Sequence, residues 1–194
     1  DVDLDNPTLR IYVHIFKDQV SVSLDSSGDS LFKRGYRVDI DSAPIKEVLA
    51  AGMVLLSGWQ PHLPFIDGMC GSGTIGIEAA LFANNIPPGC FRKEFGFMKW
   101  RNFDAELYDK IYDSCINRIK EDMPNILSSD IDVVPLEMAK RNGAVAKVDD
   151  VIRYEHISFF DLMPNKPKGT IILNPPYDER IKLEDTNAFY KQIG

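Results

Sequence analysis

The sequence lacks the residue patterns that mark metal-binding and disulfide-rich proteins. Its three cysteines, Cys70, Cys90 and Cys115, are widely spaced and form no Cys-x-x-Cys pair, and its three histidines are equally scattered. These spacings indicate neither a disulfide framework nor a zinc site, so we expect no metal. Gly-Lys-Ser and Gly-Lys-Thr are also missing, which argues against a P-loop site for nucleoside triphosphates.

Long hydrophobic runs are missing as well. No apolar run approaches membrane-spanning length, and no signal peptide leads the sequence. We therefore expect a soluble, cytoplasmic protein without a membrane partner. The 194 residues are 44% hydrophobic, which suits one α/β domain with a small appendage.

Positive charge is scarce overall. The net charge of −7 argues against a protein that binds nucleic acid through bulk electrostatics. Local basic clusters do occur, and they consist of Lys33, Arg34 and Arg37, then Arg92, Lys93, Lys99 and Arg101. Any contact with nucleic acid must be local, or supplied by sequence outside this chain.

The stretch Asn174-Pro175-Pro176-Tyr177 follows an apolar, β-branched run at residues 169–173. Such a run predicts a strand covered on both faces of a parallel sheet, and ligands bind beyond the carboxyl ends of such strands. The Asn174 side chain and the Pro175 carbonyl could accept the two hydrogens of an exocyclic amine and aim its lone pair at an electrophilic carbon. Tyr177 could stack on the base. Taken alone, the tetrapeptide could equally be a turn that ends a strand.

A glycine-rich stretch at residues 67–76 follows a short expected strand at 63–66 and leads into an amphipathic helix. Strand, glycine turn and helix start together predict a cofactor cradle. Gly71-x-Gly73-x-x-Gly76 also fits the dinucleotide fingerprint, but Asp130, the next acid at a strand end, comes much later than the about 20 positions which that motif requires. A nicotinamide enzyme is therefore disfavoured.

Two further predicted strands, at 125–132 and 157–161, also end in acids. A carboxylate at Asp130 could accept both hydroxyls of a ribose, and Ile131 could cover an adenine, while Asp132 could cap a helix at about 135–142. Asp161 could accept from the adenine amino group beside an aromatic wall. Polar residues thus end four strands, at Asp67, Asp130, Asp161 and Asn174, and this recurrence predicts a parallel α/β sheet with its site beyond the carboxyl ends of the strands.

Outside these strands, the sequence predicts peripheral elements. Residues 9–16 and 20–24 alternate like a β-hairpin, and the turn-rich segment 25–30 reads as a boundary. Ser42 could cap a helix that runs to Trp59. The apolar spacing between Phe103 and Met123 predicts a helix facing the core. Both ends of the chain look cut, so we expect part of a longer protein.

These motifs resemble those of S-adenosylmethionine-dependent amino-methyltransferases. Residues 67–74, 130–132, Asp161 and 174–177 correspond to motifs I to IV. Together with residues 31–37, 43–47 and 174–180, they resemble the THUMP-associated ribosomal RNA guanine-N2 methyltransferases, a group often labelled adenine-N6 DNA methylases. The resemblance covers nearly the whole chain. Gly68 stands where the family usually has Pro, and Asp178 stands where Gly is common.

The resemblance implies a Rossmann-like, doubly wound methyltransferase sheet over residues 31–194, without its C-terminal strands. Residues 1–30 would be a β-ribbon, the tail or linker of an upstream THUMP-like RNA-binding region. The implied cofactor residues are Asp67, Cys70, Gly71, Gly73, Thr74, Asp130, Ile131, Phe160, Asp161 and Asn174. The implied catalytic residues are Asn174, Pro175, Pro176 and Tyr177.

The function implied is methyl transfer from S-adenosylmethionine to the N2 amine of a guanine in large-subunit ribosomal RNA. Adenine-N6 methylation of DNA or RNA uses the same acceptor geometry and stays an alternative. Glutamine methylation in a protein, and a nonenzymatic RNA-binding module that keeps the fold, are further alternatives.

Overall fold

The computed structural model describes residues 3, 7–39, 44–164, 166–176 and 186–194. At its centre lies a sheet of four strands: β3 (Phe65–Asp67), β4 (Ile126–Asp130), β5 (Ile152–His156) and β6 (Thr170–Ile172). All neighbouring pairs are parallel, and the order is β5-β4-β3-β6. The chain winds from β3 out to β5 and then returns to the other side of β3. The strand order therefore reverses beside β3, and ligands of doubly wound sheets bind at such a reversal.

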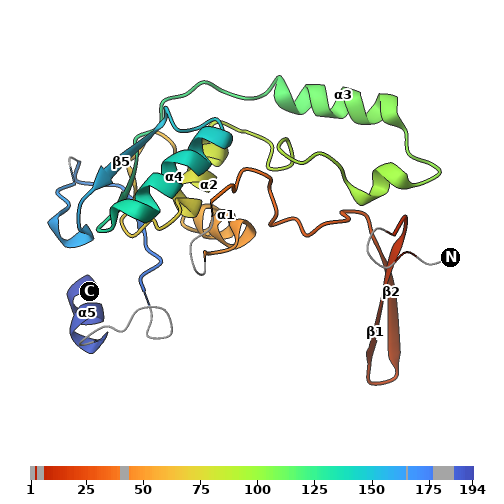
Figure 1. Cartoon of the computed structure of the whole chain (residues 1–194), viewed down its shortest axis with the longest axis horizontal. Helices are drawn as coiled ribbons and strands as arrows, with labels where there is room; N and C mark the ends of the chain where they lie inside the picture. The colour runs from red at the N-terminus through yellow and green to blue at the C-terminus, as the bar shows by residue number, and fades with distance from the viewer. Residues whose placement is uncertain (1–2, 4–6, 40–43, 165, 177–185) are drawn as a thin grey trace.

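Three helices pack together beside the sheet (Figure 1). These are α1 (Glu47–Leu56), α2 (Thr74–Ala83) and α4 (Val133–Val145). All residues of α2 except Phe82 are buried, because the helix lies between α1 and strands β3 and β4. The core formed there includes Phe65, Ile77 and Ile126, each at most 2% exposed. The predicted α/β fold with a parallel sheet is confirmed.

The predicted hairpin is also present, and Figure 1 shows it projecting from the rest of the molecule. Strands β1 (Arg10–Phe16) and β2 (Gln19–Asp25) pair antiparallel, from Arg10 opposite Asp25 to Phe16 opposite Gln19. Its apolar residues are exposed on both faces, with Val22 at 66% on one face and Phe16 at 62% on the other.

The structure contradicts the prediction that the helix after Phe103 faces the core. Helix α3 (Ala105–Ile116) has no buried residue, and Leu107 and Ile111 are more than half exposed. The helix lies outside the sheet layers, where Tyr108 packs on Phe97 and Phe103 beside the short 3-10 helix η1 (Gly96–Lys99). The helix also ends at Ile116, so Ile119 and Met123 of the expected apolar stripe lie outside it.

Two predictions about strands are also wrong. Residues 157–161 do not form a strand: β5 ends at His156, and Phe159–Asp161 form the 3-10 helix η2, which Ser158 caps by accepting from the Phe160 N–H at 3.3 Å. Strand β6 is not covered on both faces, since it lies at the edge of the sheet and Ile171 is 49% exposed. The expected cap Ser42 lies outside the described residues, and α1 begins at Glu47.

The C-terminal element α5 (Thr186–Ile193) matches the helical pattern expected there. No helix in the described parts of the chain is long and apolar enough to cross a membrane. Those parts likewise contain no group of three His, Cys, Asp or Glu side chains that could hold a metal ion.

Candidate active site at the carboxyl edge of the sheet

Asp67 ends β3 and is completely buried. Its Oδ2 accepts a hydrogen bond from the Gly76 N–H at 3.1 Å, and Gly76 is required there because a Cβ would lie 2.2 Å from Ser128 Oγ. Burial raises the pKa of the Asp67 carboxyl to about 7, against the opposing effect of the Gly76 hydrogen bond. Among the described residues, Asp67 Oδ1 and Ser128 Oγ have no hydrogen-bond partner. Asp67 therefore shapes the loop from beneath rather than facing solvent.

The glycine-rich loop between β3 and α2 has two left-handed glycines with different surroundings. Gly73 has φ +83°, and a Cβ there would lie 2.7 Å from the Ala139 Cβ on α4. Gly71 has φ +51°, and a Cβ there would meet nothing within 4 Å. The Gly71 N–H donates to Asp130 Oδ2 at 2.8 Å. The loop thus packs tightly against α4 at Gly73, whereas Gly71 borders open space.

Asp130 ends the neighbouring strand β4 and joins the loop to the next segment. Its Oδ1 accepts from the Asp132 N–H at 3.0 Å, and its main-chain carbonyl accepts from the Ile157 N–H at 3.1 Å. Each carboxylate oxygen keeps a further lone pair for a ligand hydroxyl. Asp132 caps α4 by accepting from the Val134 N–H at 2.9 Å, as expected. Ile131, between Asp130 and Asp132, is 73% exposed.

The segment after β5 brings Phe160 and Asp161 to the same edge. Both are exposed, Phe160 to 37%. Their neighbour Phe159 lies so close to Gly68 that a Cβ on that glycine would be 2.5 Å from the ring and 3.1 Å from Leu173. The space beside Gly68 is thus filled by an aromatic ring.

The Asn174-Pro175-Pro176 corner follows Leu173 directly, and all three residues are half-buried. Helix α5 supports this corner, because the Tyr190 hydroxyl donates to the Pro176 carbonyl at 2.9 Å. Next to Tyr190, Phe189 packs edge-on against Phe160, with ring centroids 5.7 Å apart. Tyr177 lies outside the described residues.

Two predicted cofactor residues of the loop are enclosed by protein. Cys70 is 8% exposed, and burial, together with the nearby Asp67 and Asp130, raises the pKa of its thiol well above the ordinary value. Thr74 is 3% exposed, and its hydroxyl accepts from an Arg37 amino group at 2.9 Å.

The sequence reasoning placed Arg37 in a basic cluster with Lys33 and Arg34 but gave it no role in the glycine loop. Its guanidinium donates to Ser72 Oγ at 3.2 Å as well as to Thr74, and forms an ion pair with Glu47 at 2.8 Å. The Arg37 and Glu47 side chains are only 12% and 5% exposed. Arg37 therefore ties the segment before α1 to both hydroxyls of the glycine loop.

Asn142 on α4 was missed as well. It is fully buried, and its Nδ2 donates to the Ser72 carbonyl at 3.1 Å. Its Oδ1 accepts from the Val38 and Asp39 N–H groups at 2.9 and 3.0 Å. One signal could have found it, because Asn142-Gly143 is a poor helix-forming pair inside a helix and so suggests a role other than helix formation.

The assembled edge suits a nucleoside with a methionine-like extension. Gly71 borders open space, the Asp130 carboxylate can accept ribose hydroxyls, and the exposed Ile131 and Phe160 side chains offer apolar surface for a flat base. The Asn174 corner lies beside the loop, because Leu173, the residue before Asn174, lies against Gly68 of the loop, as Phe159 also does. The residues present therefore fit S-adenosylmethionine. The Asn174 side chain and the Pro175 carbonyl, which could accept hydrogen bonds from an amine, lie next to them.

Comparison with known proteins agrees with this geometry. The family model of the RMKL-like methyltransferase domain matches residues 34–194. The chain belongs to this family. A second model, of the THUMP domain, matches residues 1–25. The predicted recognition of a THUMP-associated methyltransferase is thus confirmed, while the boundary near residue 30 stays a prediction.

Individual members of the RMKL-like family are similar over nearly the whole chain. "Putative RNA methyltransferase YpsC" of Bacillus subtilis (strain 168) is 41% identical over 95% of this chain and 48% of its own length. The crystal structure of SMU.472 complexed with SAH has 38% identity and a TM-score of 0.85, over 95% of this chain and 48% of SMU.472. A "predicted N6-adenine-specific DNA methylase" from Listeria monocytogenes has 39% identity and a TM-score of 0.86, over the same shares. The chain spans about half the length of the curated relatives it matches, 48% and 51%.

Proposed function

We propose that the protein transfers a methyl group from S-adenosylmethionine to the exocyclic N2 amine of a guanine in large-subunit ribosomal RNA, in the cytoplasm. The observation that carries the proposal is the closeness of the amine-acceptor corner to the glycine loop. Leu173, directly before Asn174, and Phe159, directly before Phe160, both lie against Gly68. The amine acceptors and the nucleoside-binding surface therefore belong to one site.

The cofactor assignment has support from the residues and from a relative. In our proposal, the Gly71 side of the loop receives the methionine end, Asp130 holds the ribose, Ile131 and Phe160 flank the adenine, and Asp161 accepts from its amino group. SMU.472, a relative at 38% identity, was crystallised with SAH. When bound, S-adenosylmethionine supplies an electrophilic methyl group. The buried residues of the loop, Asp67, Cys70 and Thr74, act by holding its backbone.

Catalysis rests on positioning in this account. Asn174 Oδ1 and the Pro175 carbonyl accept the two hydrogens of the target amine, which turns the nitrogen lone pair out of conjugation with the ring and towards the methyl group. Tyr177 supplies a stacking face for the extruded base. The amine becomes cationic as it is methylated and then loses one proton, so no strong base is needed. Tyr190 holds the Pro176 carbonyl and thereby the corner.

An RNA substrate is supported by the THUMP model at residues 1–25 and by relatives named as RNA methyltransferases. Adenine-N6 methylation is the second candidate, because the Listeria relative is named for that activity and an adenine N6 amine offers the same two hydrogens.

The experiment that tests the function identifies the methylated nucleoside. The full-length protein is incubated with methyl-labelled S-adenosylmethionine and either unmethylated ribosomal RNA or DNA, and the digested nucleosides are analysed by mass spectrometry. We expect labelled N2-methylguanosine from RNA. Labelled N6-methyladenine from either polymer would contradict the substrate, and no label in any nucleoside would contradict methyl transfer to nucleic acid.

A further inference from the structure

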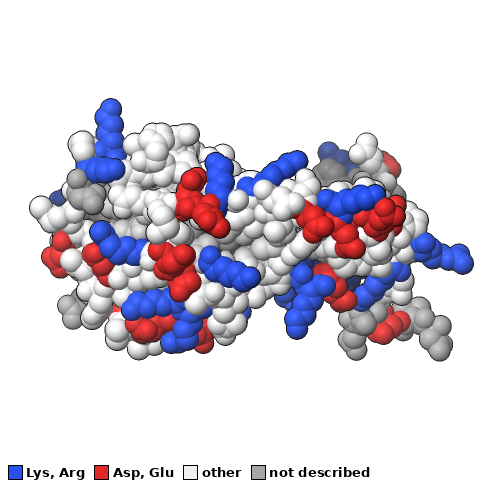
Figure 2. Space-filling model, turned by 90° about the horizontal axis from the view of Figure 1, so that it is seen from above, with Lys and Arg blue, Asp and Glu red and all other residues white. Residues whose placement is uncertain are grey.

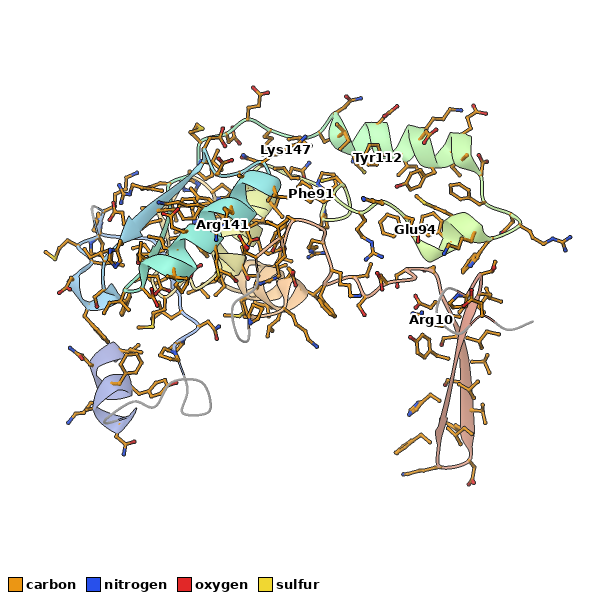
Figure 3. The ribbon with its side chains drawn as sticks, viewed as in Figure 1. Arg10, Phe91, Glu94, Tyr112, Arg141 and Lys147 are labelled. Atoms are coloured by element: carbon orange, nitrogen blue, oxygen red, sulfur yellow. The ribbon has the colours of Figure 1, made fainter. Side chains whose placement is uncertain are left out.

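A second concave site lies away from the glycine loop, between the base of the β1–β2 hairpin and the segment 91–99. We call it the junction cleft. It has a volume of about 450 Å³, and its lining residues come from the segments 7–10, 25–35 and 91–99. Figure 3 shows Arg10 and Glu94 on its two facing segments. The cleft thus lies between the part that matches the THUMP model and the insertion that carries η1.

The walls of the cleft are held together by main-chain contacts. The Gly96 and Phe97 N–H groups donate to the Ser27 and Ser26 carbonyls at 3.1 and 2.9 Å. Gly28, with φ +76°, lies so close that a Cβ there would be 3.0 Å from the Gly96 nitrogen. The two segments therefore form a defined junction without help from a ligand.

The charge of the cleft differs from that of the whole chain. The net charge is −7, and Figure 2 shows basic and acidic side chains interspersed over the surface seen from above. The cleft is lined by five cationic side chains: Arg10, Lys33, Arg92, Lys93 and Lys99. Three acids accompany them: Asp25, Asp29 and Glu94. Hydrogen bonds from Ser27 lower the pKa of Asp25, whose Oδ1 is engaged with the loop.

Arg92 differs from Arg10, Lys33 and Lys99, which form ion pairs with Asp25, Asp29 and Glu94, respectively. Its guanidinium donates to the carbonyls of Ser27, Asp29 and Ser30 at 3.0 to 3.1 Å and lies 4.8 Å from the centre of the Phe95 ring. Among the described residues it forms no ion pair. Neutral carbonyls orient the guanidinium without cancelling its charge, and its remaining N–H donors can reach an anion. Lys93, the next residue, is exposed.

We propose that the junction cleft binds the phosphate backbone of the substrate RNA, with Arg92 and Lys93 as the main phosphate contacts. The inference rests on the proposed function for the presence of RNA, and on the cleft for where the RNA is held. An acidic chain attracts a polyanion only where its cations are gathered, and phosphate contacts position an RNA without reading its sequence. The cleft lies between the hairpin that matches the THUMP model and the domain that matches the methyltransferase model, so an RNA bound by both would pass it.

The test measures binding of unmethylated large-subunit ribosomal RNA to the full-length protein, by filter binding between about 50 and about 200 mM salt. Lys93→Gln should weaken binding about 3-fold, and the double variant Arg92→Gln/Lys93→Gln about 10-fold or more, each lost cation lowering the salt slope by roughly 0.7 to 0.9. Arg92→Lys keeps the charge and should keep the slope. Lys110→Gln, on the exposed face of α3, is the matched control and should bind as the unaltered protein does.

Affinity for S-adenosylmethionine, measured on the same samples, reports whether each variant is folded. If Lys93→Gln and the double variant keep the affinity and salt slope of the Lys110→Gln control, the cleft proposal is overturned and the proposed function stands. If the unaltered protein itself fails to bind RNA, both proposals are overturned. A reduced salt slope of RNA binding in these variants, with unchanged affinity for S-adenosylmethionine, supports the cleft proposal.

Discussion

The buried carboxyl of Asp67 makes a quantitative prediction about pH. Its pKa is raised to about 7 from the ordinary 3.8, with burial as the main cause. Below about pH 4 the group is protonated in both folded and unfolded protein. As the pH rises towards 7, the unfolded chain releases this proton first, so the free energy of unfolding falls. Above pH 7 the loss is complete and amounts to about 4 kcal/mol.

Asp67→Asn should remove this dependence. An amide is neutral at every pH, and its oxygen can accept from the Gly76 N–H as Asp67 does. Relative to the unaltered protein, the variant should therefore gain up to about 4 kcal/mol in the free energy of unfolding between pH 4.5 and about pH 8.

Urea unfolding at a series of pH values measures this difference. Asp109→Asn, an exposed carboxylate on α3, is the control and should follow the unaltered protein at each pH. Parallel curves for Asp67→Asn and the unaltered protein would refute the reasoning, because they would mean that ionising Asp67 costs nothing in the folded state.

Three further predictions concern the cofactor loop and the catalytic corner. In Arg37→Lys, a single ammonium group cannot make all the contacts that the guanidinium makes with Ser72, Thr74 and Glu47. The free energy of unfolding should therefore fall by about 2 kcal/mol, and calorimetry should show weaker binding of S-adenosylmethionine. Unchanged binding would contradict the role of Arg37 in the loop. Tyr190→Phe should lower kcat several-fold while leaving cofactor affinity unchanged, because it removes only the bond to Pro176; equal loss of both would mean a general structural role. Gly71→Ala should mainly weaken the binding of S-adenosylmethionine, whereas Gly73→Ala should lower the free energy of unfolding by about 2 kcal/mol or more, because its Cβ would clash with Ala139. Calorimetry measures the binding and urea unfolding measures the stability of both variants. A larger loss of stability in Gly71→Ala than in Gly73→Ala would contradict this prediction.

The positions of the strand-end residues could be predicted because the signal is local. An apolar run followed by Asp or Asn indicates a strand and its end, and parallel strands bring their carboxyl ends to one edge. Asp67, Asp130 and Asn174 were found in this way. The cap at Asp132 was also visible, since an acid before a helix is a common N-cap.

The supporting contacts could not be predicted, because they join distant parts of the chain. Arg37 reaches Ser72 and Thr74, and Asn142 reaches back to Val38 and Asp39. No spacing rule connects such positions.

The errors in assigning elements have similarly physical causes. The aromatic run at 157–161 has strand-like composition, but Ser158 caps a turn there, and local side-chain hydrogen bonds of this kind compete with strand pairing. For α3, periodicity marks the apolar face but carries no information on what covers it. The sequence therefore indicates which residues lie at the carboxyl ends of the strands better than it indicates which residues hold them in place.

The most direct test of the account is the effect of Asn174→Ala on turnover and on cofactor binding, measured on the same preparation of the full-length protein. If Asn174 orients the target amine, methyl transfer should fall by about 100-fold or more, while the Kd for S-adenosylmethionine changes only a few-fold. Loss of cofactor binding together with turnover would place Asn174 in the cofactor pocket or in folding. Unchanged turnover would contradict the central claim.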